Sequence, residues 1–516
     1  MSVRYPCRHR SSNRLETALH CGLQGIAKVL TRGMAVAPAA VTAFLTAGCM
    51  VGPNFSSPPP PNVSSLTPEP PPRSPIPGPD QQAYVKELDI PEQWWSLFRC
   101  KPLNRIAARA IEGNADLDAA RAAVRIANAN TEAARGSFFP QIGANLGSSS
   151  QKPATAQVQS VGGSTSPYSL STGQLTVSYV PDVFGLTRRQ VESLAAQEEA
   201  QHFELEATYL TLTSKLALAA VQEASLRDQI KSAEASIDIA RDVLALLEKQ
   251  LDAHESSRVD VATQEAALAQ FEQQLQALSK QFGANRDLII ALTGHFAGEG
   301  LREKFDFACL RLPYDLPLSL PSSIVQNRPD LRAAEANMHA ATAEIGVAIA
   351  NRLPQFNLTA NGGTSASAIT KLASFSSPLL FWSIAGSAAL TLFDGMTSEQ
   401  KQHAAEAGLD HAAALYRSAV IAAFQNIADV LQAIEADRRS YIAAMRGEKA
   451  ALVNLDMTRR LLAEGQANTL QVLTAQQLYA QATSAKAQAK AARLADTVLL
   501  FQALGGGWRN TLRPVG

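Results

Sequence analysis

The sequence has few aromatic side chains, few cysteines and no excess charge of either sign. Aromatic residues make up 6% of the 516 residues, whereas hydrophobic residues make up 46%. Lys plus Arg and Asp plus Glu both number 46, so the charge gives no sign of steering toward nucleic acid or an acidic substrate. Ala, Gln, Leu and Glu dominate the second half, which is typical of long helices packed through small side chains. The composition favours a helical framework with few aromatic anchors.

The cysteines and histidines form no recognisable redox or metal-ligand motif. Cys7 and Cys21 lie in a basic N-terminal leader that ends before Cys49, so Cys100 and Cys309 are the remaining thiols. Their spacing matches no CxxC redox or zinc pattern, and a disulfide between them stays open if the chain enters an oxidising compartment. The eight histidines are scattered and none belongs to an HExxH motif. The sequence therefore implies no metal.

The N-terminus has the pattern of an exported lipoprotein. An uncharged stretch ending at Gly48 follows the basic region, and no stop-transfer pattern comes after it. Ala47 and Gly48 are the small residues that lipoprotein processing requires before a cysteine, although Thr46 occupies a position where Leu is usual. We expect residues 1–48 to be a signal peptide and Cys49 to carry a covalent lipid, with no other cofactor. An ordinary signal peptide followed by an incidental cysteine is the alternative.

Two similar segments follow a short tether. Residues 49–90 are expected to form the lipid anchor and a tether rich in Pro and Ser, which is extended rather than packed. The landmarks Asp116-Leu117 and Pro140-Gln141 recur at equal spacing as Asp330-Leu331 and Pro354-Gln355, and later landmarks drift by only a few residues. We interpret 91–300 and 301–516 as two copies of one unit that arose by duplication.

Each repeat is predicted to run helix, strand, strand, very long helix, tight turn, long helix. The strand predictions rest on alternation of apolar and polar residues, which places every second side chain on one face. The pattern predicts strands over 141–147 and 174–179 in the first repeat, and over 356–361 and 390–392 in the second. A loop rich in Ser, Gly and Thr separates the strands of each pair.

Helical periodicity resumes after the strands and continues for an unusual length. No Pro or Gly interrupts residues 187–282, and apolar residues recur at steps of three to four almost to His254. A helix of about 65 residues would be on the order of 100 Å long, more than a globular domain needs. Turns are expected at 253–257 and, in the second repeat, at 464–468. The chain should therefore contain two long helical hairpins that project outward.

Strands with one apolar and one polar face suit a membrane barrel, with a soluble sandwich as the alternative. Four strands cannot bury two sheet faces well, and open sheet edges are not viable in lipid. Closure therefore requires several chains. Two chains would give about eight strands, a barrel filled by side chains, whereas three would give twelve and leave a lumen. The sequence thus predicts an oligomer whose hairpins extend the barrel as a helical tube.

Several short motifs occur along the chain in a characteristic order. They are Cys49 followed by Val51-Gly52-Pro53-Asn54-Phe55, then Trp94-Trp95 with Phe98 and Leu103, Arg328-Pro329-Asp330-Leu331, Leu353-Pro354-Gln355, Leu392-Phe393-Asp394-Gly395, and Leu504-Gly505-Gly506-Gly507-Trp508. In this order they make the chain resemble the TolC-like outer-membrane efflux proteins, in particular the NodT and OprM branch of RND efflux lipoproteins. The resemblance covers nearly all of the mature chain.

The resemblance implies a mainly α fold with membrane β structure. It implies a homotrimer with a 12-stranded β-barrel in the cell outer membrane, a helical barrel in the periplasm and a mixed equatorial region. The implied partners are a periplasmic adaptor (membrane fusion) protein, an inner-membrane RND-type pump and outer-membrane lipid, with no nucleic acid. The implied function is passive conduction of drugs and toxic compounds to the exterior, without catalytic residues.

Two regions are candidate sites. In related proteins, ionic and hydrogen-bonding contacts close the periplasmic end, and a similar charged segment here supplies the candidate gate residues Asp456, Arg459, Arg460 and Glu464. A solvated helix face is the alternative for these four. The candidate adaptor-contact tips are Ser257, Arg258, Val259 and Asp260 in the first hairpin and Asn468, Thr469, Leu470 and Gln471 in the second.

Other noted residues are expected to be architectural. Pro329 should begin a helix, with Asp330 favourable at the N-terminal end of its dipole, and Gly185 and Gly395 should permit tight strand-to-helix turns. The competing function is a lipid-anchored periplasmic coiled-coil adaptor or scaffold without a pore. An enzyme is a third possibility, which no triad, metal cluster or phosphate loop in the sequence supports.

Overall fold

The computed structural model describes residues 50–59, 61, 81–86, 88–152, 166–318, 321–374 and 379–508. Cys49, the expected signal peptide and most of the expected tether lie outside the described residues. The chain divides into two compact units. Of the described residues, the first unit contains those in 50–52, 137–189 and 346–395, and the second contains the others.

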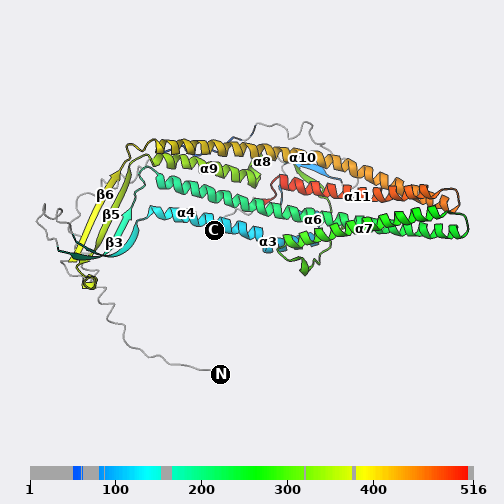
Figure 1. Cartoon of the computed structure of the whole chain (residues 1–516). Helices are drawn as coiled ribbons and strands as arrows, with labels where there is room; N and C mark the ends of the chain where they lie inside the picture. The colour runs from blue at the N-terminus through cyan, green and yellow to red at the C-terminus, as the bar shows by residue number, and fades with distance from the viewer. Residues whose placement is uncertain are drawn as a thin grey trace, which may run out of the picture. The chain divides into compact units, whose positions relative to one another are not determined.

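The first unit is a four-stranded antiparallel sheet with the strand order β2-β3-β5-β6. Its strands are β2 (Gln141–Gln151), β3 (Tyr168–Tyr179), β5 (Gln355–Ala366) and β6 (Leu380–Ala389), of which β3, β5 and β6 are labelled in Figure 1. Short 3-10 turns, Gly136–Phe138 and Ile369–Ser374, lie before β2 and between β5 and β6. Each repeat thus contributes one pair of strands, and β3 joins β5 across the two repeats.

The prediction of a strand at 390–392 is wrong. β6 ends at Ala389, which pairs with Gln355, the first residue of β5. Leu390 and Leu392 continue the apolar alternation, but they lie beyond the end of the partner strand and therefore have no ladder to join. The true strand was hard to see because small residues on both faces weaken its alternation. The other three strand predictions are confirmed, with each strand longer than predicted.

The second unit is dominated by helices. They are α3 (Lys101–Gly113), α4 (Ala115–Arg135), α6 (Leu186–Asp252, whose first turn belongs to the sheet unit), α7 (Arg258–Leu292), α8 (Pro321–Asn327), α9 (Pro329–Ala350, whose last turn belongs to the sheet unit), α10 (Thr397–Ala463) and α11 (Thr469–Ala503). Both α6 and α10 are 67 residues long, so the predicted very long helices are confirmed. The antiparallel partners α7 and α11 complete the two hairpins, and Figure 1 shows α10 beside α11.

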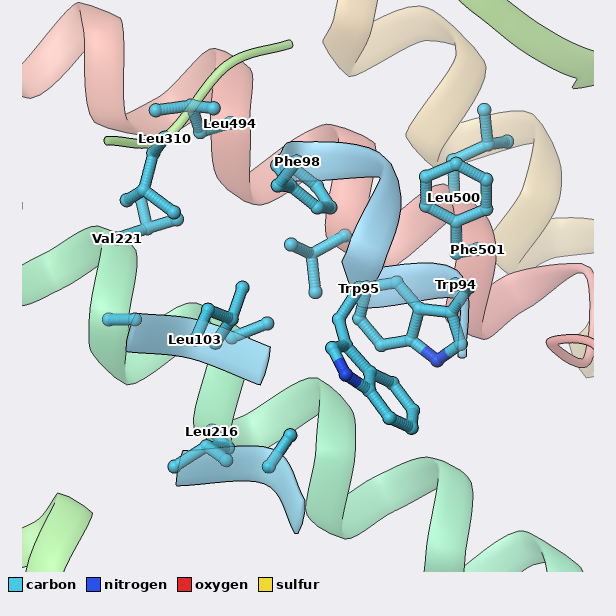
Figure 2. Close-up of a cluster of buried hydrophobic side chains, with 14 of the residues drawn as sticks. Trp94, Trp95, Phe98, Leu103, Leu216, Val221, Leu310, Leu494, Leu500 and Phe501 are labelled. Atoms are coloured by element: carbon cyan, nitrogen blue, oxygen red, sulfur yellow. The ribbon is translucent and has the colours of Figure 1, made fainter. Parts of the chain in front are cut away.

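A buried core holds the N-terminal segment against the helices. The 3-10 turn Trp94–Phe98 inserts aromatic rings next to α11, where Trp94 stacks on Phe501 with ring centroids 5.6 Å apart. Figure 2 shows these rings together with aliphatic side chains such as Leu216 and Leu500. Trp94 and Trp95 are both buried, so they pack the N-terminal segment onto the helices.

A second connection to this segment was not anticipated. The short strand β1 (Ala83–Lys86) pairs in parallel with β4 (Asp315–Leu318), which lies near the start of the second repeat. Cys100 and Cys309 form a disulfide with their Cα atoms 5.0 Å apart, which settles the pairing that the sequence left open. The start of the first repeat is therefore joined covalently to the start of the second.

The Arg328-Pro329-Asp330 motif is architectural, as expected. Pro329 begins α9, and Arg328 forms an ion pair of 2.7 Å with Asp330 while donating a hydrogen bond of 2.8 Å to the carbonyl of Ala503. Gly505 has φ +91°, and a Cβ atom there would lie 2.3 Å from the carbonyl oxygen of Asn327. The C-terminal glycines thus let the end of α11 approach the start of α9 closely, and no phosphate-binding role is needed to explain them.

Candidate functional site

One face of the sheet carries apolar side chains on all four strands. The register places Ile142 of β2 opposite Val177 of β3, Val177 opposite Ala360 of β5, and Ala360 opposite Ile384 of β6. Ile142 and Ile384, on the two outer strands, are 73% and 77% exposed. Further exposed apolar side chains on the four strands are Leu146, Leu175, Leu358 and Trp382. An exposed apolar surface spread over four strands is what a lipid-facing sheet requires.

The opposite face is polar but carries no charge. Thr176, Asn361 and Ser383 form a cross-strand row on it, and the Ser178 hydroxyl donates a hydrogen bond of 3.3 Å to Oδ1 of Asn357. No Asp, Glu, Lys, Arg or His occurs in any of the four strands. Hydroxyl and amide groups suit contact with water, so this face can line an aqueous lumen without a fixed charge.

The sheet is open at both sides. Within the part of the chain that the structure describes, neither β2 nor β6 pairs with a further strand on its outer side. Each outer strand therefore presents unpaired backbone N–H and C=O groups. Such groups cost several kcal/mol each if they are exposed to hydrocarbon, by an order-of-magnitude estimate of about 2–7 kcal/mol for an unpaired amide. The sheet of one chain is incomplete as a membrane structure.

The ends of the two hairpins are built alike. Ser257 caps α7 and Asn468 caps α11, and each forms a reciprocal capping box with the residue three positions later, Asp260 or Gln471. A hydrogen bond from the Ser257 hydroxyl lowers the pKa of Asp260, and the side chain of Thr469 also hydrogen-bonds this carboxylate. The two predicted tips are therefore capped in the same way, and Thr469 links one to the other.

The second residue of each returning helix presents an apolar side chain at these tips. Val259 is 73% exposed and Leu470 is 66% exposed. Arg258 is also exposed, whereas Thr469 is buried and faces the neighbouring hairpin end. Of the eight predicted contact residues, Val259 and Leu470 are thus the apolar pair available to a partner, and the capping residues fix their positions.

Three of the four candidate gate residues come together. Asp456, Arg459 and Arg460 line a hollow of about 430 Å³ between α10 and α6. Arg459 forms an ion pair of 3.2 Å with Asp242 of α6, which lines the same hollow. This contact joins the second hairpin to the first. The structure thus gives one of the charged residues a specific partner on another helix.

The sequence analysis missed Asp242, and Glu464 lies outside this cluster. Glu464 is the C-cap of α10, where its backbone N–H donates to the carbonyl of Arg460, and it does not line the hollow. Asp242 lies in a helix with several other charged residues, so only knowledge of which faces meet could have singled it out. No sequence signal identifies that pairing.

An apolar contact lies beside the ion pair. Val243 and Leu247 of α6 pack against Leu462 and Val472 of the second hairpin in a small buried cluster. Farther along, the Gln264 side chain donates a hydrogen bond of 3.3 Å to Oε1 of the Gln476 side chain, and the two residues are buried. The two hairpins of one chain therefore pack closely, and the exposed ion pair is one of several contacts between them.

Two carboxyls near the N-terminal segment have raised pKa values. Burial raises the pKa of Asp496 on α11 to about 7, and the charge of Asp437 and a hydrogen bond with it add to the shift. Burial likewise raises the pKa of Glu206 on α6 to about 7, with the charge of Glu92 as a second cause. Both carboxyls favour the protonated form because a second charge would be costly in these surroundings.

The sequence matches a known protein family over most of its length. The family described as Outer membrane efflux protein matches residues 106–295 and 320–506. The pyoverdine export outer membrane protein OpmQ of Pseudomonas aeruginosa is 30% identical over 427 residues, covering 81% of this chain and 88% of that protein. Nodulation protein T of Rhizobium leguminosarum bv. trifolii is 25% identical, covering 90% of this chain and 96% of that protein.

Solved structures of channels share the fold. The outer-membrane channel OprN superposes with a TM-score of 0.80 at 25% identity, covering 89% of this chain and all of that one. The CmeC outer membrane channel of Campylobacter jejuni also gives a TM-score of 0.80, at 20% identity, and covers 89% of this chain and 95% of that one. The expected TolC-like fold is confirmed, and the adaptor without a pore finds no support among these proteins. The chain belongs to the outer membrane efflux protein family and is a TolC-like channel protein of the outer membrane.

Proposed function

We propose that three copies of this chain form the passive exit duct of a tripartite efflux system. The observation that supports a trimer is the open sheet of the described chain, which has an exposed apolar face and an unpaired outer strand on each side. Pairing β6 of one copy with β2 of the next removes both edges, and three copies supply twelve strands. Two copies would give about eight strands, a barrel that side chains fill. Three copies are therefore the fewest that leave a water-filled lumen.

The membrane section of this duct has no electrostatic filter in its strands. The polar face carries hydroxyl and amide groups and no ionisable side chain. A neutral wall neither attracts nor repels a cargo because of its charge. Relatives of this chain are named as export or efflux proteins for pyoverdine, antibiotics and toluene, which are chemically diverse. The duct conducts small molecules of several classes, and selection belongs to the pump.

The hairpin ends form the regulated end of the duct. The Arg459–Asp242 ion pair holds the two hairpins of one chain together in the closed state, and opening separates them. An adaptor that binds the exposed Val259 and Leu470 in the open state better than in the closed state shifts the equilibrium toward opening. The partners are therefore a periplasmic adaptor and, through it, an inner-membrane pump of the RND type.

A lipid on Cys49 completes the assembly at the membrane. The support is the sequence pattern before the cysteine and the likeness to the NodT branch of the family. The intact mass of the mature chain tests this part directly, because diacylglycerol and an N-acyl chain add a defined mass to a chain that begins at Cys49. An unmodified chain with the same start, or a chain cut elsewhere, would contradict it.

The native mass of the protein tests the duct itself. The protein is extracted in mild detergent from purified outer membranes and its mass is measured with bound detergent subtracted. We expect a trimer that resists dissociation and that forms conducting pores in a planar lipid bilayer. A monomer that forms no pore would leave four strands without closure and would overturn the proposal.

A further inference from the structure

The described chain begins with three residues that are held tightly against the sheet unit. The backbone N–H of Val51 donates a hydrogen bond of 3.2 Å to the carbonyl of Phe184, just after β3. Arg189, in the first turn of α6, donates from Nε to the carbonyl of Val51 at 3.0 Å and from Nη2 to the carbonyl of Gly52 at 3.1 Å. One guanidinium thus holds two consecutive carbonyls of the segment that follows Cys49.

The guanidinium is itself enclosed. The side chain of Arg189 is fully buried, and a Cβ atom at Gly346 of α9 would lie 2.8 Å from its Cγ, Cδ and Nε atoms. Gly185 has φ +81°, and a Cβ atom there would lie 2.9 Å from Cγ of Met50. Two glycines therefore leave the space that the arginine and the terminal segment occupy. Met50–Gly52, Arg189, Gly185 and Gly346 are called the terminal seat below.

The second repeat provides an internal comparison. Gly395 occupies the place of Gly185 and also has a positive φ, of +64°, but no atom lies within 4 Å of a Cβ built on it. Four residues after each glycine, the first repeat has Arg189 and the second has Glu399. The strand-to-helix turn therefore requires only the glycine. The arginine and the close packing are additions made in the one repeat that receives the N-terminal segment.

The terminal seat lies at the end of the sheet that carries exposed aromatic residues. Phe139 precedes β2 and Phe393 follows β6, and the antiparallel register places both at the same end as Phe184. Phe139 and Phe393 are largely exposed. Aromatic side chains mark the two water interfaces of a membrane barrel. The residues after Cys49 are thus held where the sheet meets a membrane surface.

We propose that Arg189 is a positioning residue for the lipid anchor: it fixes the first residues after Cys49 so that the lipid and the aromatic end of the sheet meet the same membrane surface. This inference rests on the proposed lipidation of Cys49. An arginine suits the task because its planar fork can donate to two carbonyls at once, whereas a lysine ammonium presents one point charge. The rigid link lets the lipid and the sheet insert together as one body.

The test compares Arg189→Lys with Glu399→Lys, its counterpart in the second repeat, each in two forms of the full-length protein. One form keeps its own leader, and the other has a leader that ordinary signal peptidase removes, which leaves a mature chain without lipid. The measured quantities are the rate at which dissociation-resistant trimer appears in the outer membrane and the hydrogen exchange of the Val51 amide. Intact mass reports whether each form carries lipid.

We expect Arg189→Lys to speed exchange of the Val51 amide by about tenfold, the equivalent of one weakened charged hydrogen bond. It should slow trimer formation several-fold in the lipidated form and leave the rate nearly unchanged in the form without lipid, while Glu399→Lys changes neither quantity. An equal slowing in both forms would make Arg189 a structural residue only and overturn the proposal. A native chain without lipid would refute the lipidation of Cys49, and faster Val51 exchange alone would then reduce the seat to a contact of the chain terminus.

Discussion

Arg459 on α10 and Asp242 on α6 form an ion pair of 3.2 Å that connects the ends of two different hairpins of one chain. Both side chains are partly exposed, at 34% and 69%. An exposed pair of this kind contributes little to stability, about 0.2–1 kcal/mol. Its effect should therefore appear in the balance between closed and open hairpin ends, which a small energy can shift, rather than in folding.

Replacing either partner should make the channel leakier. We expect Asp242→Ala and Arg459→Ala each to raise single-channel conductance or open time in a planar bilayer, because the closed state loses a contact that the open state lacks. Adding Arg460→Ala to Arg459→Ala should increase the effect. The double exchange Asp242→Arg with Arg459→Asp should restore the closed state.

The neighbouring Arg241 offers a matched control for the gate. It forms an ion pair of 2.9 Å with Glu272 inside the first hairpin, so Arg241→Ala removes a similar charge contact without separating the hairpins. Conductance, antibiotic sensitivity and adaptor affinity that stay at wild-type values in the Arg459→Ala, Arg460→Ala double variant would refute the gate assignment.

Adjacent residues of β3 should respond oppositely to a charge. Leu175 lies on the apolar face and Gln174 on the polar face. Leu175→Lys places an ammonium in hydrocarbon, at a cost of about 2–4 kcal/mol near the bilayer midplane. We expect it to lower the yield of dissociation-resistant trimer in outer membranes, whereas Gln174→Lys assembles normally and shifts the reversal potential toward anions. Normal assembly of both variants would contradict the assignment of the two faces.

The carboxyl of Asp496 should make stability depend on pH. Its pKa is raised from 3.8 to about 7, so the protonated form is the one that the fold favours. The stabilisation is fully present below pH 3.8 and is lost as the pH rises to about 7. Tyr84, Glu435, Asp437 and Arg438 form the titratable and charged surroundings of this site.

Removing that charge should stabilise the protein in alkaline solution. We expect Asp496→Asn to raise the midpoint of thermal unfolding at pH 8 and to reduce the fall in the midpoint between pH 4 and pH 7. The control is Asp429→Asn, which changes an exposed carboxylate on α10, the helix that also carries Asp437. A midpoint that falls equally with pH in the wild type and in Asp496→Asn would show that this carboxyl is not the cause.

The disulfide should be detectable without any structure. A maleimide carrying a polymer tag should leave the denatured, lipidated mature chain unshifted on a gel until a reductant is added, after which two tags attach. The Cys100→Ala, Cys309→Ala double variant should unfold more easily, by about 2–4 kcal/mol, because the bridge restricts the unfolded chain. Tagging of Cys100 or Cys309 without a reductant, located by peptide mass, would contradict the pairing.

The sequence predicts the parts of this fold that depend on local pattern. The hairpin turns are a clear case. The first turn, predicted at 253–257, fills the gap between the end of α6 at Asp252 and the start of α7 at Arg258. The second turn, predicted at 464–468, lies between the end of α10 at Ala463 and the start of α11 at Thr469. Helix caps and long uninterrupted periodicity are local signals, so they can be read from consecutive residues of the sequence.

Features that depend on a distant partner were not predictable from one sequence. The β1–β4 pair consists of two four-residue strands far apart in the chain, and neither is long enough to show alternation. The pairing of Arg459 with Asp242 depends on which faces of two 67-residue helices meet. The strand β6 was misplaced for the same reason, since its end is set by where β5 begins and not by its own side chains.

Because of the Cys100–Cys309 bridge, cleavage of the backbone has a different result in each of the two hairpins. It encloses the whole first hairpin, so a protease that cleaves between Asp252 and Arg258 leaves both fragments joined through sulfur. A cut between Ala463 and Thr469 releases a C-terminal fragment that only packing retains. A cut at the first hairpin end therefore leaves a single disulfide-linked molecule, whereas a cut at the second hairpin end yields two fragments with no covalent link.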